Sequence, residues 1–201
     1  MAFSQNKEEE HILEYFGDFV GTFCDIGAND GVTFSNTRAL ALRGWKGIAI
    51  EPAPLAFNKL KELYKDRKDI FTYDYAISKN NGKAILQASG PLCSAADVGL
   101  VSTFHQHEKE RFSRTVKYDP IEVKTYRWKT ALNRWPIKEF DFISMDCEGD
   151  EMNILPSINF EKVKLLAIEW NSVPNNKLHF DKYLDGFKVI YTSAENLLYA
   201  R

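Results

Sequence analysis

The sequence predicts an open α/β fold, in which a mainly parallel sheet carries helices on both faces. Three observations lead to this class. Short apolar runs alternate with amphipathic segments along all 201 residues. The last two apolar runs, 187–192 and 197–199, are too close for a parallel crossover, so the final strand is expected to be antiparallel. Hydrophobic residues make up 44% and charged residues 27% of the chain, which is typical of a globular domain.

Glycine and proline divide the first part of the chain into elements. Gly17 ends an entry helix, Gly44 stands where a helix C-cap is expected, and Pro54 suits the first turn of a helix. The expected elements, in order, are a helix over 5–16, a strand over 22–26, a helix over 34–43, a strand over 47–51, a helix over 54–64 and a strand over 70–75.

The second part of the chain opens with an excursion. A turn signal at 80–82 predicts a hairpin or loop over 76–92, and 93–118 is expected to form a loop or short helix over the site. Pro136 and Pro156 end two later helices. The remaining expected elements are a strand over 121–126, a helix over 128–135, a strand over 140–145, a helix over 150–155, a strand over 165–169, a helix over 176–184, and strands over 187–192 and 197–199.

Size, charge and cysteine usage narrow the class of protein. The chain is expected to be one domain over 1–201, with an entry helix within 1–20. Its 26 basic and 28 acidic residues give a net charge of −2, so it is not a polycation built for nucleic acid. The cysteines Cys24, Cys93 and Cys147 form no CxxC pair, which disfavours a disulfide framework or a zinc knuckle.

Neither an export signal nor a membrane span is expected from this sequence. The N-terminal residues contain no apolar signal core, and no run of ~18 apolar residues occurs, so no membrane span is expected. The simplest expected location is the reducing cytoplasm. A domain cut from a larger chain would show the same features.

Acidic residues stand where an open α/β sheet binds ligands, which is beyond the carboxyl ends of its strands. Five segments follow expected strands at these positions, and each opens with an acid. These acids are Asp25, Glu51, Asp74, Asp146 and Glu169. This regularity is the strongest functional observation in the sequence.

The turn DIGANDG after the first strand predicts a ligand close to the backbone. Gly27 and Gly31 allow a sharp turn around Ala28 and Asn29, and the next helix offers free N–H groups. A dinucleotide site would need G-x-G-x-x-G, but the middle glycine is missing. The carboxylate of Asp25 would repel a phosphate and instead suits a cationic amine. The alternative is a plain strand–turn–helix joint.

Glu51, twenty residues after Gly31, completes the description of this ligand. An acid at the end of the second strand, next to Pro52, can accept both hydroxyls of a ribose. S-adenosylmethionine, with S-adenosylhomocysteine as its product, fits a ligand with an adenosine, a cationic tail and no phosphate. Asp74 and Ala76, after the third strand, are candidates for the adenine edge, with a plain loop as the alternative.

The segment 139–151 contains six acids and no base. Clustered carboxylates repel one another unless something offsets them. One candidate partner is the sulfonium of the cofactor, and another is a substrate hydroxyl whose proton passes to Asp146 or Glu148. A third is a divalent cation held by Asp146, Glu169 and Asn171.

Three other polar residues have weaker interpretations. Asp150, and in part Glu151, suit the N-terminus of the helix that follows. His179 lies in a helix expected after the fifth strand end and can face the substrate there. As a catalytic base it ranks below Asp146.

Residues 109–138 hold nine Lys or Arg against three acids. Basic residues interleaved with aromatic ones can indicate a nucleic-acid or nucleotide-sugar surface. A solvated face over core aromatics is the more common explanation. The aromatic residues are Phe112, Tyr118, Tyr126, Trp128 and Trp135.

Four segments, FCDIGANDG, IAIEPAPLAFNKL, DFISMDCEGDEMNIL and LLAIEW, occur in an order that resembles the FkbM-type S-adenosylmethionine-dependent methyltransferases. The resemblance runs from about residue 23 to the C-terminus. It implies the class I methyltransferase fold, a Rossmann-like open sheet of seven strands. That sheet is mostly parallel with an antiparallel last strand, and it has helices on both faces.

The resemblance also implies O-methylation of a hydroxyl on a sugar, a glycan or a similar polyol or polyketide acceptor. Such domains also occur beside glycosyltransferases, so a glycosyltransferase in the same pathway or chain is an expected partner, and the chain can be one module of a glycan-biosynthesis protein. The residues implied to bind the cofactor are Asp25, Gly27, Ala28, Asn29, Gly31, Glu51, Pro52, Asp74, Ala76 and Asp146, with Asp146 and Glu148 facing the transferred methyl group.

Two other functions stay open at this point. An RNA methyltransferase would use the basic and aromatic stretch, but the sequence has no N/D-P-P-Y motif and its net charge is negative. A non-catalytic domain would keep the fold and bind only a glycan or a protein partner. Binding of S-adenosylmethionine separates this last alternative from the enzymes.

Overall fold

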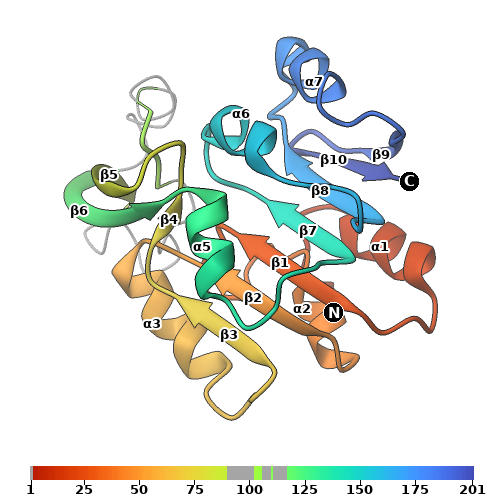
Figure 1. The fold of residues 1–201 in the computed structure, drawn as a ribbon, viewed down its shortest axis with the longest axis horizontal. Coiled ribbons are helices and arrows are strands. Elements are labelled where there is room, and N and C mark those ends of the chain that lie inside the picture. Colours follow the sequence, from red (N-terminus) through yellow and green to blue (C-terminus); the bar gives the residue numbers. More distant parts are fainter. Residues whose placement is uncertain (1, 90–101, 106–109, 111–116) are drawn as a thin grey trace.

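The computed structural model describes residues 2–89, 102–105, 110 and 117–201, and a seven-stranded sheet forms its centre (Figure 1). The strand order is β3-β2-β1-β7-β8-β10-β9. All pairs from β3 to β8 are parallel, whereas β10 is antiparallel to both of its neighbours. The predicted open sheet with an antiparallel last strand is therefore confirmed. The strands are β1 Thr22–Ile26, β2 Lys46–Ile50, β3 Ile70–Tyr73, β7 Phe142–Met145, β8 Leu165–Glu169, β9 Lys188–Thr192 and β10 Asn196–Ala200.

Helices cover both faces of this sheet, as predicted (Figure 1). Successive strand residues point to opposite faces, so Phe23 packs in one core cluster and Cys24 in the other. The cluster around Phe23 includes residues of α1, α2 and α3, and the cluster around Cys24 includes residues of α5, α6 and α7. The helices are α1 Glu8–Phe16, α2 Arg38–Leu42, α3 Pro54–Leu63, α5 Trp128–Arg134, α6 Glu151–Ile154 with the 3-10 turn η1 Leu155–Ser157, and α7 Pro174–Asp181.

A second, three-stranded sheet lies beside the first in the order β4-β6-β5. Its strands are β4 Ala76–Ile77, β5 Gly82–Ser89 and β6 Tyr118–Tyr126. The strand expected over 121–126 therefore exists but does not join the main sheet, and the expected excursion over 76–92 contains β4 and β5. Leu86 and Val123 pack on Ala53 and Ala56 at the start of α3, which holds the small sheet against the main domain.

The helix expected over 34–43 begins four residues later, at Arg38. Phe34 has a φ of +57°, which is outside the helical region. The Oγ of Ser35 accepts hydrogen bonds from the backbone N–H groups of Thr37 and Arg38, which satisfies donors at the helix start. Residues 34–37 are consequently loop, and they are free to line the site described below.

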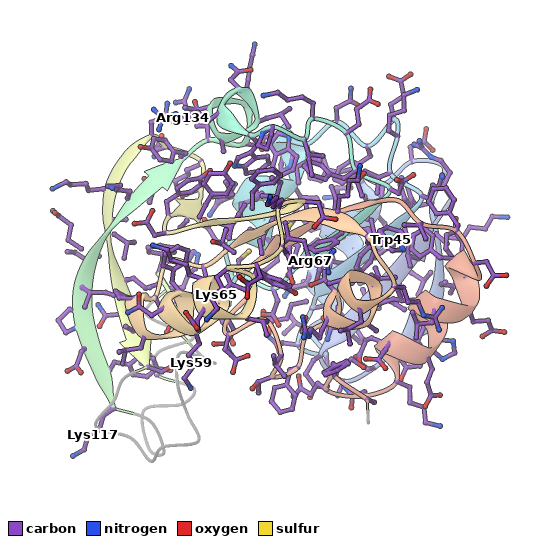
Figure 2. All side chains as sticks on the ribbon, turned by 90° about the horizontal axis from the view of Figure 1, so that it is seen from below. Trp45, Lys59, Lys65, Arg67, Lys117 and Arg134 are labelled. Carbon is purple, nitrogen blue, oxygen red and sulfur yellow. The ribbon has the colours of Figure 1, made fainter. Side chains whose placement is uncertain are left out.

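The two tryptophans of the basic stretch belong to the core, and Tyr126 packs against it. Trp128 and Trp135 are 5% and 1% exposed, and the Nε1 of Trp135 donates to the hydroxyl of Tyr75 at 2.5 Å. The guanidinium of Arg134 lies over the ring of Tyr126, 4.2 Å from its centroid. Figure 2 shows Arg134 and Lys117 at separate places on the molecule. Phe112 lies outside the described residues. Within the described residues 117–138, this stretch thus fits a solvated face over core aromatics.

Two further expectations concern cysteines and membranes. Cys24 and Cys147 both carry free thiols, and Cys93 lies outside the described residues. Of the helices in the described ranges, none combines the length and the apolarity that crossing a membrane requires. Most of the loop expected over 93–118 also lies outside these ranges, although Ser102 and Phe104 do line the cavity described next.

Candidate functional site

A cavity of about 420 Å³ opens beyond the carboxyl ends of β1, β2, β7 and β8. This is where an open α/β sheet is expected to bind its ligand, and the volume suits a small molecule. The cavity brings together most of the residues that the sequence singled out. Those that line it are Asp25, Gly27, Ala28, Asn29, Glu51, Pro52, Ala76, Asp146, Glu148, Glu169 and Asn171.

The floor of the cavity is the turn after β1. Gly27 and Ala28 both donate their N–H groups to the carbonyl of Ile50, at 3.0 and 2.9 Å, which ties the turn to the end of β2. Gly27 has a φ of +85°, and a Cβ there would stand 1.7 Å from the carbonyl oxygen of Asp146. Only glycine fits this position, so the sharp backbone turn predicted from DIGANDG is a steric requirement.

Asp25 is buried beneath this turn. Its Oδ2 accepts a hydrogen bond of 2.5 Å from the hydroxyl of Thr37. Burial raises the pKa of Asp25 to about 7, and the nearby charge of Asp146 acts in the same direction, whereas the Thr37 bond lowers it. A cationic ligand group would favour the ionised form.

Glu51 is held in place by backbone donors. Its Oε2 accepts from the N–H of Asn29 at 2.9 Å, and its Oε1 accepts from the N–H of Ala53 at 2.7 Å. Burial nevertheless raises the pKa of Glu51 to about 7, because these hydrogen bonds only partly offset it. Each carboxylate oxygen keeps a further lone pair for a ligand hydroxyl.

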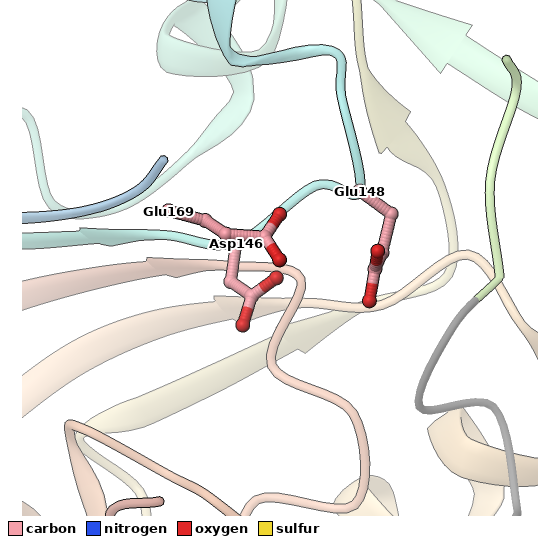
Figure 3. A group of neighbouring side chains, drawn as sticks. All are labelled: Asp146, Glu148 and Glu169. Atoms are coloured by element: carbon pink, nitrogen blue, oxygen red, sulfur yellow. The ribbon is translucent and has the colours of Figure 1, made fainter. Parts of the chain in front are cut away.

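The opposite wall carries a group of three carboxylates. Met145 pairs with Ile168 in the register of β7 and β8, so Asp146 and Glu169 stand side by side at the strand ends. Ligand atoms of Asp146, Glu148 and Glu169 all lie within 4.8 Å of one another, and Figure 3 shows their carboxylates turned towards a shared space. Burial raises the pKa of Asp146 to about 6 and that of Glu169 above its usual range, and mutual repulsion adds to the latter.

The loop that carries Glu148 is braced on both sides. Glu151 accepts hydrogen bonds from the N–H groups of Cys147 at 2.5 Å and Gly149 at 3.0 Å. On the other side, the hydroxyl of Thr103 donates to the carbonyl of Glu148 at 2.7 Å. Burial raises the pKa of Glu151 to about 8. Glu151 therefore has a structural role at the start of α6. This agrees with the prediction that it partly serves the N-terminus of that helix.

Asp150 does more than favour a helix N-terminus. It is 4% exposed and lines the cavity, and it makes no side-chain cap on α6. Its Oδ1 instead accepts from the side chain of Asn153 at 2.6 Å and lies 3.4 Å from Nε2 of His105. Asp150 therefore stands at the N-terminus of α6, as predicted, and also lines the cavity.

Three predicted site residues do not line the cavity. Gly31 faces α3, where an added Cβ would lie 2.7 Å from Leu60, so this glycine permits helix packing. Asp74 is exposed at the end of β3. His179 lies on α7 with its ring 5.3 Å from that of Tyr183. The structure does not bring His179 to the carboxylate group.

Sequence reasoning missed a wall made from distant segments. Gln5 and Glu195 line the cavity together, and the Nδ2 of Asn6 donates to Oε2 of Glu195 at 2.7 Å. Buried Glu8 accepts from the hydroxyl of Ser193 at 2.7 Å, which fixes the N-terminal segment there. No local pattern reveals such pairings.

Ser35 and Asn36 form another part of the lining that was missed. The polar residues directly before the apolar part of the helix could have predicted a loop at this position. Asn36 donates from Nδ2 to the hydroxyl of Ser144 at 3.4 Å, across from β7. Its Oδ1 has no hydrogen-bond partner within the described ranges, so this atom is available to a ligand.

A seven-stranded sheet of this order, with a ligand cavity at these strand ends, defines the class I methyltransferases. Within that class the chain belongs to the FkbM family, because the model of the methyltransferase FkbM domain matches residues 25–191. It is accordingly an S-adenosylmethionine-dependent methyltransferase. A comparison with curated proteins gave no match.

Solved structures support the fold at low sequence identity. PH1948 from Pyrococcus horikoshii, described as a candidate RNA methyltransferase, is 13% identical, with a TM-score of 0.50 over 97% of this chain and 83% of its own. The ribosomal protein L11 methylase from Lactobacillus delbrueckii subsp. bulgaricus is 11% identical, with a TM-score of 0.51 over 96% and 76%. WbdD is 10% identical, with a TM-score of 0.51, and this chain spans 39% of its length.

The residues present fit S-adenosylmethionine. Gly27 packs directly on the carbonyl oxygen of Asp146, which fixes the turn that lines the cavity. The carboxylate of Glu51, oriented by two backbone N–H groups, suits ribose hydroxyls. Asp25 suits the cationic amine. The carboxylates near Asp146 remain for the sulfonium or for the acceptor.

Proposed function

We propose that this protein transfers a methyl group from S-adenosylmethionine to a hydroxyl of a sugar, a glycan or a similar neutral polyol. The observation that carries the proposal is the charge of the cavity. Among its described lining residues, seven are carboxylic acids and none is lysine, arginine or histidine. Such a site repels phosphates and carboxylates and accepts neutral or cationic groups.

The same observation weighs against an RNA acceptor. A polynucleotide would bring phosphates towards the acidic lining, and the aromatic residues Trp128 and Trp135 are buried, so they offer no stacking surface. The likeness to a candidate RNA methyltransferase concerns the fold alone. A neutral hydroxyl meets no such repulsion and can donate a hydrogen bond to a carboxylate.

Asp146 and Glu148 are the proposed proton acceptors. When bound, S-adenosylmethionine supplies an electrophilic methyl group whose C–S bond breaks towards sulfur as the acceptor oxygen forms the new C–O bond. The hydroxyl proton passes to a carboxylate oxygen of Asp146 or Glu148. The raised pKa of Asp146, about 6, makes it a stronger base than an ordinary aspartate. Gly27 and Glu51 position the cofactor, and positioning supplies much of the rate.

The test combines cofactor binding with turnover. S-adenosylhomocysteine is titrated calorimetrically into the wild type and Asp146→Asn, and methyl transfer to a panel of neutral sugars is then measured. Asp146→Asn is expected to bind S-adenosylhomocysteine within a few-fold of the wild type and to lose about 100-fold or more in kcat. The exposed Asp66→Asn is the matched control and retains wild-type turnover.

Three outcomes contradict the proposal. Unchanged turnover in Asp146→Asn removes the assigned base. Failure of the wild type to bind S-adenosylhomocysteine would leave only a domain that binds a glycan or a protein partner on this fold. Methyl transfer to RNA but not to sugars would favour the alternative RNA methyltransferase.

A further inference from the structure

We propose that Asp146, Glu148 and Glu169 bind one divalent cation, of the Mg²⁺ or Mn²⁺ type, which holds the acceptor hydroxyl. This inference rests on the proposed function, because it assigns the carboxylate group to the acceptor end of the cavity. Its first support is geometric. One oxygen from each side chain lies within 4.8 Å of the other two, and the three carboxylates face a shared space (Figure 3).

The backbone holds this arrangement in place. The parallel register of β7 and β8 sets Asp146 beside Glu169. Both strands contribute buried residues to the hydrophobic core, so their ends are held in place. Glu148 follows on a loop that Glu151 and Thr103 brace with hydrogen bonds. Oxygen ligands already held near one another lose little freedom when a hard cation binds, and carboxylate oxygens are the ligands that Mg²⁺ and Mn²⁺ prefer.

A second observation is independent of that spacing. Glu169 is 6% exposed and lines the cavity, yet its Oε2 has no hydrogen-bond partner in the part of the chain that the structure describes. Buried polar atoms in native proteins almost always have a hydrogen-bond partner, so an unpartnered carboxylate oxygen in a cavity points to a bound group. An oxygen with a free lone pair inside a cavity is what a metal ligand requires.

The charges in the cavity point the same way. Seven acids line it with no basic residue among the described lining. S-adenosylmethionine brings a sulfonium, an ammonium and a carboxylate, a net charge of one. Asp25 and Glu51 lie at the glycine turn, and the charge of Asp146 reaches both of them. The seven acids exceed the single positive charge of S-adenosylmethionine, so a cation bound by Asp146, Glu148 and Glu169 would offset their mutual repulsion, which a neutral acceptor does not do.

The cation has a defined chemical use at this position. A hydroxyl bound to a divalent cation loses its proton more readily, because the cation stabilises the alkoxide. With the cation bound, the proton passes to water or to a cavity carboxylate that does not ligate the cation, instead of to Asp146 or Glu148. No electron transfer is involved, so a redox-inactive ion such as Mg²⁺ is sufficient. Mg²⁺ usually retains open positions for water or substrate, which leaves room for the acceptor oxygen.

The test uses Mn²⁺ alone as the probe. Mn²⁺ is titrated into the protein, and the free ion is followed by its electron paramagnetic resonance signal. The wild type is compared with Glu148→Gln, Glu169→Gln and the control Glu161→Gln, which changes an exposed glutamate. Circular dichroism checks that each variant is folded. Glu148 is only half-buried, so Glu148→Gln provides a readout even if Glu169→Gln fails to fold.

The expected result is one Mn²⁺ per chain in the wild type and in Glu161→Gln. Each cavity variant should bind at least about tenfold more weakly, because ligand charge count sets the affinity of such sites. Absence of stoichiometric binding overturns the proposal, and so does equal affinity in folded cavity variants.

Titration of S-adenosylhomocysteine in the presence of a chelator separates this proposal from the proposed function. If S-adenosylhomocysteine binds and Mn²⁺ does not, the metal site is refuted and the proposed methyltransferase function stands. Mn²⁺ binding without nucleoside binding supports the metal site and removes the proposed function.

Discussion

Replacing Asp25 with asparagine is expected to stabilise the ligand-free protein at pH 8 relative to the wild type, and much less so at pH 5. Asp25 is 4% exposed, and burial raises its pKa from 3.8 to about 7. An acid whose pKa is raised by folding contributes stability that is complete below its ordinary pKa and is lost as the pH rises through the folded-state pKa. Asparagine keeps an acceptor for the Thr37 hydroxyl but does not titrate.

The size of the effect follows from this shift in pKa. Each pH unit over which the unfolded carboxyl is ionised and the folded one is protonated changes the free energy of unfolding by about 1.4 kcal/mol. For Asp25 that interval runs from near pH 4 to about pH 7. Between pH 5 and pH 8, the free energy of unfolding of Asp25→Asn should therefore gain about 3 kcal/mol relative to the wild type.

The assay is urea unfolding of both proteins at pH 5, 6, 7 and 8. Glu51 and Asp146 also have raised pKa values, so both proteins become less stable with rising pH. The difference between the two proteins reports the ionisation of Asp25 together with its repulsion of these neighbours. A difference that stays constant from pH 5 to pH 8 would refute the reasoning. Asp66→Asn is the control, because Asp66 is exposed and its replacement should change the free energy of unfolding equally at every pH.

The same variant should lose function while it gains stability. Without the carboxylate, the cationic amine of the ligand loses a charged partner, which is typically worth about 1.5–3 kcal/mol. Asp25→Asn should therefore bind S-adenosylhomocysteine at least about tenfold more weakly at pH 8 in a calorimetric titration. Equal affinity would show that Asp25 does not meet the amine.

Two other substitutions test the packing around the site. Gly27→Ala should abolish binding of S-adenosylhomocysteine in calorimetry and lower the melting temperature, because its Cβ would stand 1.7 Å from the carbonyl oxygen of Asp146 at a φ of +85°. Tyr75→Phe removes the acceptor of the buried Trp135 N–H and should cost about 1–3 kcal/mol in urea unfolding. Neither Tyr75 nor Trp135 lines the cavity, so affinity for the nucleoside should not change.

The strands of the main sheet were predictable because both of their faces are buried. Residues 165–169, for example, are apolar up to the final acid, and all five are buried in β8. Residues 121–126 show the limit of this reasoning. Their alternation predicts a strand, but the choice between two sheets depends on contacts with α3 that no local pattern contains.

The start of α2 was predicted too early for a similar reason. Apolar spacing from Phe34 onward fits a helix, but the chain adopts a φ of +57° at Phe34, and Ser35 supplies the turn. The spacing of side chains carries no information about such a backbone conformation. As a result, the polar lining at Asn36 was hidden inside an expected helix.

The site was predictable where residues follow strands directly. Asp25, Glu51, Asp146 and Glu169 meet at one cavity because the carboxyl ends of parallel strands lie at one edge of a sheet. His179 was expected from its place after β8, but α7 carries it away from the lining. The direction in which a helix leaves its strand is set by packing, which the sequence alone does not give.

The wall shared by Asn6 and Glu195 has a consequence for how the protein folds. These residues are 189 positions apart and are joined by a hydrogen bond, and Glu8 meets Ser193 over a similar separation. Contacts between such distant positions close the largest loops and form late. During synthesis, the N-terminal segment must wait until almost the whole domain has emerged before this wall can close. The complete cavity lining, with Gln5 beside Glu195, therefore exists only after almost the whole domain has been synthesised.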